Sequence, residues 1–305
     1  MTTPIGVLVM AYGTASDQDD VERYYTDIRG GRAPSPEALE ELKARYAAIG
    51  DTFPLTKITT EQADALGRAL GETFRTYIGM KHSPPFVAEG VARMREDGIQ
   101  NAVGLVLAPH YSKMSVGGYI DRVKKAADED GGPAFSFVEQ WYDHPAFLEV
   151  LTERVASARA SLTDEERDND LIVFTAHSLP TKILEYGDPY PAQLQDTADR
   201  VAGALGLDRY RIGWQSEGRT PDPWIGPPLD EIIRKSAAEG HSAIVVCPAG
   251  FVSDHLEILY DIDIEARAVA EEAGIVLVRT ASMNADPAFI DALAKVVRDH
   301  VFKEG

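Results

Sequence analysis

VLVMAYG at residues 7–13 and IVFTAHS at residues 172–178 are two versions of one short pattern, and this repetition decides the fold. Each is an apolar, β-branched run that ends in an aromatic ring or an imidazole and a turn residue, which is typical of a buried strand. Aligning the two stretches places Tyr12 opposite His177. Because they begin at residues 7 and 172 of a 305-residue chain, the sequence predicts two similar halves.

Three further pairs of similar stretches follow in the same order. They are YIGMK (77–81) with RIGWQ (211–215), LVLAPHY (105–111) with IVVCPAG (244–250), and HPAFLEVLTERV (144–155) with DPAFIDALAKVV (286–297). The two members of the earlier pair, residues 7–13 and 172–178, lie further apart in the sequence than the members of any of these three pairs. The first half is therefore expected to carry an insertion within residues 20–70. The polar run SLTDEERDND (161–170) is expected as the linker between the halves.

Short β-branched runs, each followed by a turn signal and a helical pattern, recur along the whole chain. The expected strands are residues 5–11, 73–79, 102–108, 135–140, 171–176, 210–214, 243–247 and 275–279. Helical patterns lie between them, among them residues 36–49, 192–205 and 256–273. This alternation favours parallel sheets built from βαβ units. The sequence therefore predicts an α/β protein with two domains, residues 1–160 and 170–305, each a parallel sheet flanked by helices.

The chain is acidic, with 30 lysines and arginines against 49 aspartates and glutamates and a net charge of −19. Such a surface repels nucleic acid and anionic membranes, so neither is expected as a partner. The single cysteine, Cys247, excludes an internal disulfide and an iron–sulfur cluster held by this chain alone. No signal peptide or transmembrane segment is recognisable, and a cytoplasmic protein is expected.

Ligands of open parallel sheets bind at the carboxyl ends of the strands. Two such halves facing each other would form a cleft between them. Its expected lining is Tyr12, His82, the loop 109–119, His177, the loop 215–224 and the segment 248–257. Aromatic and polar residues cluster in several of these loops, which suits a flat, apolar ligand.

His177 and a run of carboxylates are the first candidates for chemistry. His177 follows an apolar run, where an imidazole can ligate a metal, transfer a proton, or only bond a loop carbonyl. Asp254, Glu257, Asp261 and Glu265 are spaced to share one stripe of a predicted helix. The stripe is either solvated surface or a series of oxygen ligands that leads a divalent cation toward the cleft.

A cluster of cations lies inside the expected insertion. Its members are Arg29, Arg32, Lys43 and Arg45. Arginine binds carboxylates through two parallel hydrogen bonds, so the cluster could anchor a substrate with several carboxylates. The alternative is pairing with the glutamates at positions 37, 40 and 41.

Several of these stretches together resemble the motifs of the ferrochelatase family. They are MAYGT (10–14), residues 23–59, APHYSKMSVGGY (108–119), FTAHSLP (174–180), EYGDPYP (185–191), GWQSEGRTPDPWIGP (213–227) and PAGFVSDHLEILYDIDIE (248–265). The resemblance covers nearly the whole chain. It is greatest to the short ferrochelatases of Gram-positive bacteria, which lack an iron–sulfur cluster and insert iron into coproporphyrin III.

The resemblance implies two Rossmann-like domains with the porphyrin in the cleft between them. It makes His177 and Glu257 the catalytic metal-site pair on one face of the ring and Tyr12 the ligand on the opposite face. Residues expected to hold the porphyrin and its propionates are Arg29, Arg45, Tyr46 and Tyr119. Phe53 stands where close members have serine, so it is expected to pack on the ring instead of bonding a propionate. Asp261 and Glu265 match a second, outer cation site, which could take Mg2+.

The resemblance implies a lyase of haem biosynthesis that inserts ferrous iron into a porphyrin and releases two protons. Coproporphyrin III is the expected porphyrin, with protoporphyrin IX as an alternative. Iron is expected as a substrate, and no permanently bound cofactor is expected. A cobalt chelatase for related rings and a non-catalytic haem or porphyrin carrier are competing interpretations. A monomer is expected, together with an acceptor protein for the product haem.

Overall fold

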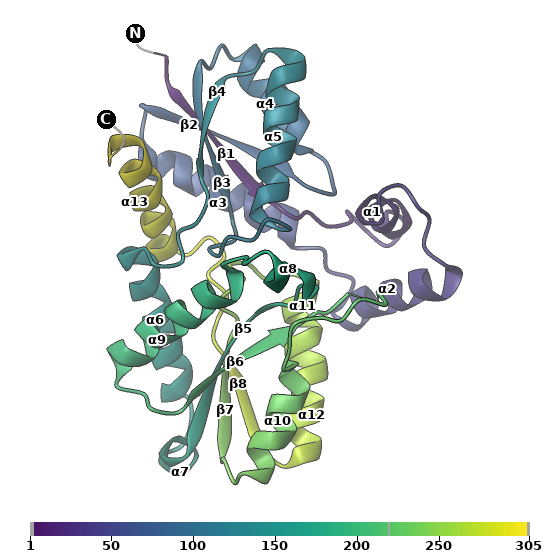
Figure 1. The fold of residues 1–305 in the computed structure, drawn as a ribbon, viewed down its shortest axis with the longest axis vertical. Helices are drawn as coiled ribbons and strands as arrows, with labels where there is room; N and C mark the ends of the chain where they lie inside the picture. The colour runs from purple at the N-terminus through teal and green to yellow at the C-terminus, as the bar shows by residue number, and fades with distance from the viewer. Residues whose placement is uncertain (1–2, 219, 304–305) are drawn as a thin grey trace.

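The computed structural model describes residues 3–218 and 220–303. In this part of the chain, two parallel four-stranded sheets lie end to end along the long axis of the molecule, and helices flank both (Figure 1). The strand orders are β2-β1-β3-β4 and β6-β5-β7-β8, so the second sheet repeats the topology of the first. The predicted α/β class with two similar halves is confirmed.

The helices and strands have the following bounds. The first half contains β1 (Ile5–Ala11), α1 (Val21–Ile28), α2 (Pro36–Ala48), α3 (Leu55–Leu70), β2 (Phe74–Met80), α4 (Val87–Glu96), β3 (Asn101–Val106), α5 (Val116–Asp130) and β4 (Ala134–Val138). Then come α6 (Pro145–Ala160), α7 (Asp164–Asp168), β5 (Asp170–His177), α8 (Lys182–Glu185), α9 (Tyr190–Leu205), β6 (Tyr210–Gln215), α10 (Leu229–Ala238) and β7 (Ala243–Cys247). The chain ends with α11 (Leu256–Leu259), the π-helix η1 (Asp261–Ala266), α12 (Arg267–Ala273), β8 (Val276–Arg279) and α13 (Pro287–Lys303).

The eight predicted strands are confirmed within a few residues, and the expected linker contains the short helix α7. One helix prediction is wrong in detail. Residues 256–273 do not form a continuous α-helix, because η1 interrupts them between α11 and α12. A π-helix has a wider turn than an α-helix, so the spacing rule behind the predicted carboxylate stripe fails there.

Alternate residues of the central strands enter different cores, as the two-residue period of a strand requires. In β1, Val7 and Val9 belong to a large core that both halves share, whereas Leu8 packs under α4 and α5. In β5, Phe174 belongs to the shared core, whereas Val173 packs under α10 and α12. Both sheets are therefore buried on both faces, which explains their continuous apolar sequences.

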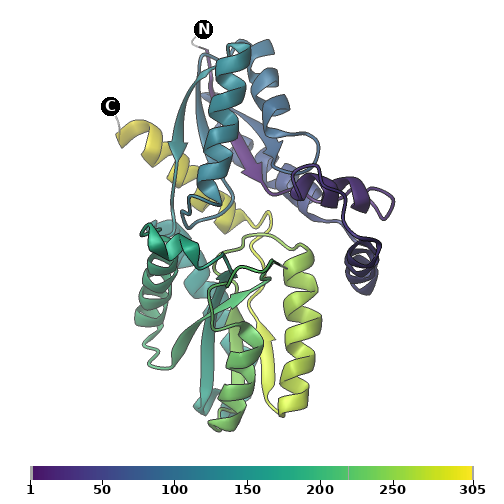
Figure 2. The same ribbon diagram turned by 45° about the vertical axis from the view of Figure 1, so that its right-hand side comes forward.

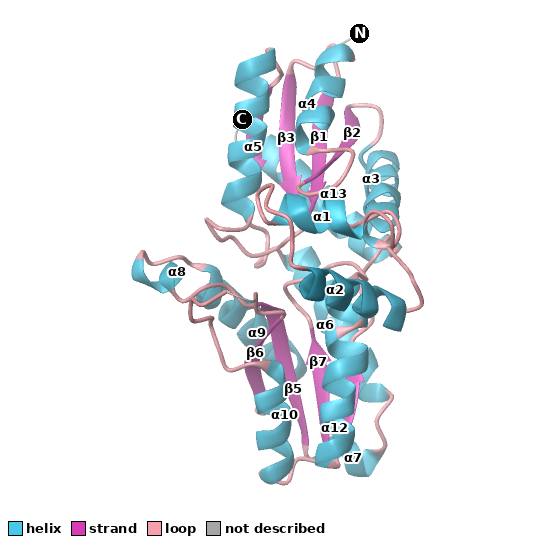
Figure 3. Ribbon diagram, turned by 90° about the vertical axis from the view of Figure 1, so that its right-hand side faces the viewer, coloured by secondary structure: helices cyan, strands magenta, loops and turns pink. Residues whose placement is uncertain are grey.

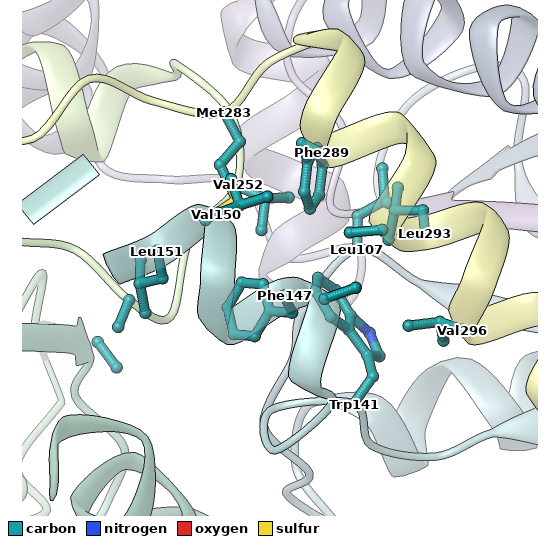
Figure 4. Packing of buried hydrophobic residues seen from close by; sticks show 14 of the residues in the cluster. Leu107, Trp141, Phe147, Val150, Leu151, Val252, Met283, Phe289, Leu293 and Val296 are labelled. Carbon is teal, nitrogen blue, oxygen red and sulfur yellow. The ribbon is translucent and has the colours of Figure 1, made fainter. Parts of the chain in front are cut away.

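The last helix of each half packs against the other half. Helix α6 contacts β7, β8 and α9 of the second half, and α13 contacts β3, β4 and α3 of the first. Their side chains form the centre of the shared core, where Trp141 and Phe147 lie close to Phe289 (Figure 4). The division into domains at residues 160–170 stays a proposal. This exchange of helices gives the two halves one continuous core.

The expected insertion contains α1, α2 and α3. Helices α1 and α2 project from the side of the molecule at the level where the two sheets meet (Figure 2). They have a small core of their own, which includes Val21, Tyr24 and Tyr46. Helix α3 instead packs against β1, β2 and α13 as part of the first half. The projecting pair therefore forms one wall of the space between the sheets.

Candidate functional site

A cavity of about 910 Å³ lies between the carboxyl ends of the two sheets. Segments that follow β1, β3, β5, β6 and β7 line it, and α2 closes one side (Figure 3). Of the residues and segments expected from the sequence, all reach the cavity except His82. The cleft predicted from the repeated pattern is therefore present in the structure.

His177 and Glu257 form a pair in the wall that the second half contributes. His177 ends β5, and its Nε2 lies 3.5 Å from a carboxylate oxygen of Glu257 in α11. The Nδ1 of His177 contacts the backbone carbonyl of Ser178. Because a carbonyl only accepts, Nδ1 carries a proton, and Nε2 is the atom that can gain or lose one. The two side chains remain 34% and 35% exposed, and both line the cavity.

Each member of this pair holds the other in its charged form. Burial lowers the pKa of His177, but the Glu257 carboxylate outweighs burial, and the net pKa is raised above its ordinary value. Burial raises the pKa of Glu257, but His177 outweighs it, and the net pKa is lowered. The pair can therefore hold a proton near neutral pH and release it when a second cation approaches.

Gln215 and His255 hold this pair in place, and sequence reasoning did not assign them. The Gln215 side chain accepts a hydrogen bond from Thr175 in β5 at 2.7 Å and donates one to the Glu257 carbonyl at 2.9 Å. The Nδ1 of His255 accepts from the Glu257 amide at 3.1 Å and caps α11. Their positions beside His177 and Glu257 depend on tertiary contacts. The only indication in the sequence was that both residues lie in segments expected to line the cleft, residues 215–224 and 248–257.

Among the described residues, five tyrosines of the first half line the cavity, and Tyr12, Tyr46 and Tyr119 among them were expected from the sequence. Tyr12 follows β1 and is half-exposed, whereas Tyr46 of α2 and Tyr119 of α5 are buried. The hydroxyls of Tyr46 and Thr14 are 2.9 Å apart. Desolvation and, after it, the Glu257 carboxylate raise the pKa of Tyr12, so its hydroxyl is neutral in the empty cavity. The sequence placed all three rings in the site, and the structure brings them to one cavity.

His82 lies behind Tyr12 and outside the cavity lining. Its ring is tilted against that of Tyr12, with 4.6 Å between the ring centroids. Its Nδ1 lies 2.6 Å from a carboxylate oxygen of Asp27 in α1. His82 therefore supports Tyr12 from behind, through its ring and through a backbone hydrogen bond to the Tyr12 carbonyl.

Arg45 connects the projecting helices to the second half. Its guanidinium nitrogens lie 3.6 Å from Asp261 and 3.6 Å from Glu265, both in η1. It also lies over the ring of Tyr260, at 4.9 Å from the centroid. All three charged side chains line the cavity. Arg45 therefore reaches beyond the glutamates of α2, because the tertiary fold places two carboxylates of η1 beside it.

Asp254 does not belong to the carboxylate stripe, and this part of the prediction is wrong. It precedes α11 in extended backbone, where Ser282 and Asn284 donate hydrogen bonds to its carboxylate at 2.6 and 2.8 Å. Arg279 lies beside it and binds both oxygens of Asp263 at 2.8 Å. This network turns Asp254 away from the cavity, whereas Glu257, Asp261 and Glu265 line it.

Arg29 and Phe53 are not part of the cavity lining. Arg29 is exposed at the end of α1, with its guanidinium 5.8 Å from the centroid of the Tyr25 ring. Phe53 stacks on Tyr46 with 4.3 Å between the centroids and belongs to the small core of the insertion. The expected contact of Phe53 with a bound ring finds no support in this arrangement, because Tyr46 lines the cavity and Phe53 does not.

The metal-ligating residue types are sparsely placed. Within residues 3–218 and 220–303, no three histidine, cysteine, aspartate or glutamate side chains are grouped so that they could hold a metal ion.

Cys247 is buried in β7, as expected, and burial raises the pKa of its thiol to about 12. None of the helices in the described part is long and apolar enough to cross a membrane.

Asp261→Asn is expected to stabilise the protein more at pH 8 than at pH 5. Burial and the Glu257 carboxylate raise the pKa of Asp261 from 3.8 to about 7. Between pH 3.8 and about pH 7, Asp261 of the folded chain keeps a proton that Asp261 of the unfolded chain has lost. The free energy of unfolding therefore falls as the pH rises through this range. Asparagine does not titrate, so the variant avoids the loss of stability that the wild type undergoes as the pH rises. The variant should therefore be more stable than the wild type by roughly 1–2 kcal/mol at pH 8. Thermal melts at pH 5, 7 and 8 measure it, and a pH-independent difference in Tm would contradict it.

The fold and the cavity define a two-sheet chelatase-type protein. The cobalt complex of the sirohydrochlorin chelatase SirB from Bacillus subtilis subspecies spizizenii has this fold, with a TM-score of 0.55, 11% identity, and coverage of 97% of this chain and 94% of SirB. SirB from Bacillus subtilis with Fe3+ aligns with a TM-score of 0.61, again at 11% identity, over 99% of this chain and 97% of the other. At this identity the likeness establishes the fold alone.

The chain belongs to the ferrochelatase family, whose model matches residues 4–301. It is 50% identical to the coproporphyrin III ferrochelatase of Geobacillus kaustophilus, over 98% of this chain and 97% of the relative. It is 49% identical to the coproporphyrin III ferrochelatase of Bacillus subtilis, over 96% of each chain. The expected family is confirmed, and with it an enzyme of the metal-chelating lyase type.

Proposed function

We propose that this protein inserts ferrous iron into coproporphyrin III and releases two protons, as a step of haem biosynthesis. The observation that carries the proposal is the His177–Glu257 pair in one wall of a cavity whose other wall presents Tyr12. The cavity volume of about 910 Å³ lies within the range of ligand and cofactor sites. Relatives that are 49–50% identical and carry the name coproporphyrin III ferrochelatase support the choice of porphyrin.

In the proposed reaction, the Nε2 of His177 accepts the two pyrrole protons one after the other, and it passes the first to Glu257 or to solvent in the cavity before it accepts the second. Metallation requires the loss of two protons from the ring nitrogens, and the free Nε2 of neutral His177 faces the cavity. A positioned base of this kind accelerates proton transfer by about 10²–10⁴-fold. Glu257 then either holds the iron beside the ring or takes the proton onward, because its lowered pKa keeps it ionised. Iron is a substrate in this scheme.

Tyr12 is proposed to approach the iron from the opposite face of the ring. Its hydroxyl is neutral in the empty cavity, because desolvation raises its pKa. A ferrous ion would supply the positive charge that favours an oxygen ligand at this position. Binding energy from carboxylate contacts at the ring edge could offset the bending that exposes the ring nitrogens.

Arg45, Tyr46 and Tyr119 are proposed to hold the ring and its carboxylates from the first half, with Arg29 at the rim. Arg45→Ala is expected to raise the KM for the porphyrin by about tenfold, because a charge-assisted contact is lost. The KM for ferrous iron should change far less. Steady-state kinetics with each substrate varied in turn measures the two constants.

Arg32→Ala is the matched control, because Arg32 is exposed and its Nε donates to the Arg29 carbonyl in the same turn. Equal changes of both KM values in Arg45→Ala would show that Arg45 acts mainly through Asp261 and Glu265. The propionate role would then be excluded.

One assay tests the proposed activity. Purified protein is mixed under anaerobic conditions with ferrous iron and either coproporphyrin III or protoporphyrin IX, and the metalloporphyrin is followed by its absorbance. Faster turnover of coproporphyrin III is expected. Turnover of protoporphyrin IX alone would reassign the substrate. Porphyrin binding without metallation would identify a carrier.

Further expectations belong to the same proposal. Asp261 and Glu265 are proposed as an outer cation site that could take Mg2+, supported by the raised pKa of Asp261 and by their shared position in η1. A monomer in the cytoplasm that passes its product to an acceptor protein completes the proposal. Equilibrium dialysis with Mg2+, comparing the wild type with Glu265→Gln, tests the outer site.

A further inference from the structure

Among the described residues, the lysine and arginine side chains that line the cavity are those of Arg45 and Lys81. Arg45 already has two carboxylate partners at 3.6 Å, Asp261 and Glu265. Lys81, which follows β2, has no ion pair and no side-chain hydrogen bond in the described part of the chain. Since the protein carries a net charge of −19, a cation without a carboxylate partner inside its main cavity requires a physical reason.

The surroundings of Lys81 are aromatic and cationic. Its Nζ lies 5.0 Å from the centroid of the Tyr119 ring, and Arg122 donates a hydrogen bond to the Lys81 carbonyl at 2.9 Å. Burial and, after it, Arg122 lower the pKa of Lys81 to about 8. A half-buried ammonium in such surroundings is destabilised until an anion compensates its charge.

Gly118 leaves room for this ammonium. A Cβ atom at position 118 would lie 3.3 Å from the Nζ of Lys81, so a larger side chain would displace it. Position 118 lies inside α5, where glycine is a poor helix former. A glycine at this position therefore leaves the Nζ of Lys81 in place.

We propose that Lys81 binds a carboxylate of the porphyrin, at a second anchoring position separate from that of Arg45. The inference rests on the proposed function and specifies the substrate class as a ring with carboxylates at more than one position. The charged and aromatic neighbours of Arg45 are Asp261, Glu265 and Tyr260, whereas those of Lys81 are Tyr119, Gly118 and Arg122. The two cations thus share none of these neighbours, which is the arrangement expected of two separate anchoring positions for a ring with several carboxylates.

The test measures the binding of metal-free porphyrins by absorbance and fluorescence titration. Lys81→Met should weaken the binding of coproporphyrin III by about tenfold or more, as expected for the loss of one charge-assisted contact. Lys81→Arg should bind within about threefold of the wild type, because it keeps the charge. Gly118→Leu should weaken binding without changing any charge. Lys125→Met is the matched control, since Lys125 lies on the exposed face of α5.

The outcomes separate this inference from the proposed function. Binding of coproporphyrin III that is equally tight in Lys81→Met and Lys125→Met would overturn the role of Lys81. An equal loss of affinity for the dimethyl ester of protoporphyrin IX, which has no free carboxylate, would also overturn it and assign a packing role. Because no iron is present, the titration stands even if the wild type fails to metallate the ring.

Discussion

His177→Ala is expected to reduce the rate of iron insertion by about a thousandfold while porphyrin binding persists. The substitution removes the only atom of the His177–Glu257 pair that can accept a proton as a neutral base, the Nε2 of His177. General bases contribute about 10²–10⁴-fold to a rate, and His177 is also proposed to help position the metal. Because the ring is proposed to be held by contacts with the first half, its dissociation constant should change little. Stopped-flow absorbance gives the rate, and fluorescence titration gives the affinity.

His241→Ala is the appropriate control for this variant. His241 precedes β7 at the amino end of the sheet, away from the cavity, and contacts Glu239 and the Asn169 carbonyl. It should metallate at the rate of the wild type. Undiminished turnover by His177→Ala would remove His177 from the mechanism, and a parallel loss of porphyrin binding would show that it acts mainly in substrate binding.

Glu257→Gln is expected to lower the rate by about a hundredfold or more and to shift its dependence on pH. In the wild type, burial lowers the pKa of His177, but the Glu257 carboxylate outweighs it and raises the net value. The rate should rise with pH as His177 loses its proton. Without the carboxylate, the largest contribution that raises the pKa is lost and burial is opposed only by Ser178 and Asp261, so the pKa of His177 falls and this acidic limb moves to lower pH. Profiles of kcat between pH 5 and 9 measure the shift.

The sign of that shift distinguishes two roles for Glu257. If the Glu257 carboxylate only holds iron, Glu257→Gln should lower the rate without shifting the acidic limb of the pH profile. Glu239→Gln is the control, because Glu239 pairs with Arg211 on the surface and should change neither the rate nor the profile. A limb that moves to higher pH in Glu257→Gln would contradict the electrostatic coupling seen in the structure.

The sequence was informative about the residues at the ends of strands. Tyr12 and His177 were predicted as cavity residues because each follows an apolar run, and strand ends are encoded by local periodicity. Glu257 and Asp261 were also found from local spacing. Asp254 was misplaced because a spacing of three or four residues implies a common face only within a continuous α-helix. The helix begins after Asp254 and is later interrupted by η1.

Ion pairs between segments that lie far apart in the sequence could not be predicted from local patterns. Arg45 was expected to face glutamates of its own helix or a substrate, and the fold places Asp261 and Glu265 beside it. Lys81 carried no signal in the sequence, since its lack of a partner is a property of everything packed around it. Such contacts join residues of different helices and strands, so propensity and periodicity do not constrain them.

The sequence by itself determined two similar halves, eight strands and the identity of the side chains at the strand ends, because these depend on patterns within a few residues and on repetition. Only the tertiary structure decided how the halves join, through the exchange of α6 and α13 and a shared core. It also decided which charges meet in the cavity. Packing brings distant segments together, and it leaves Arg45 neutralised by two carboxylates and Lys81 without one.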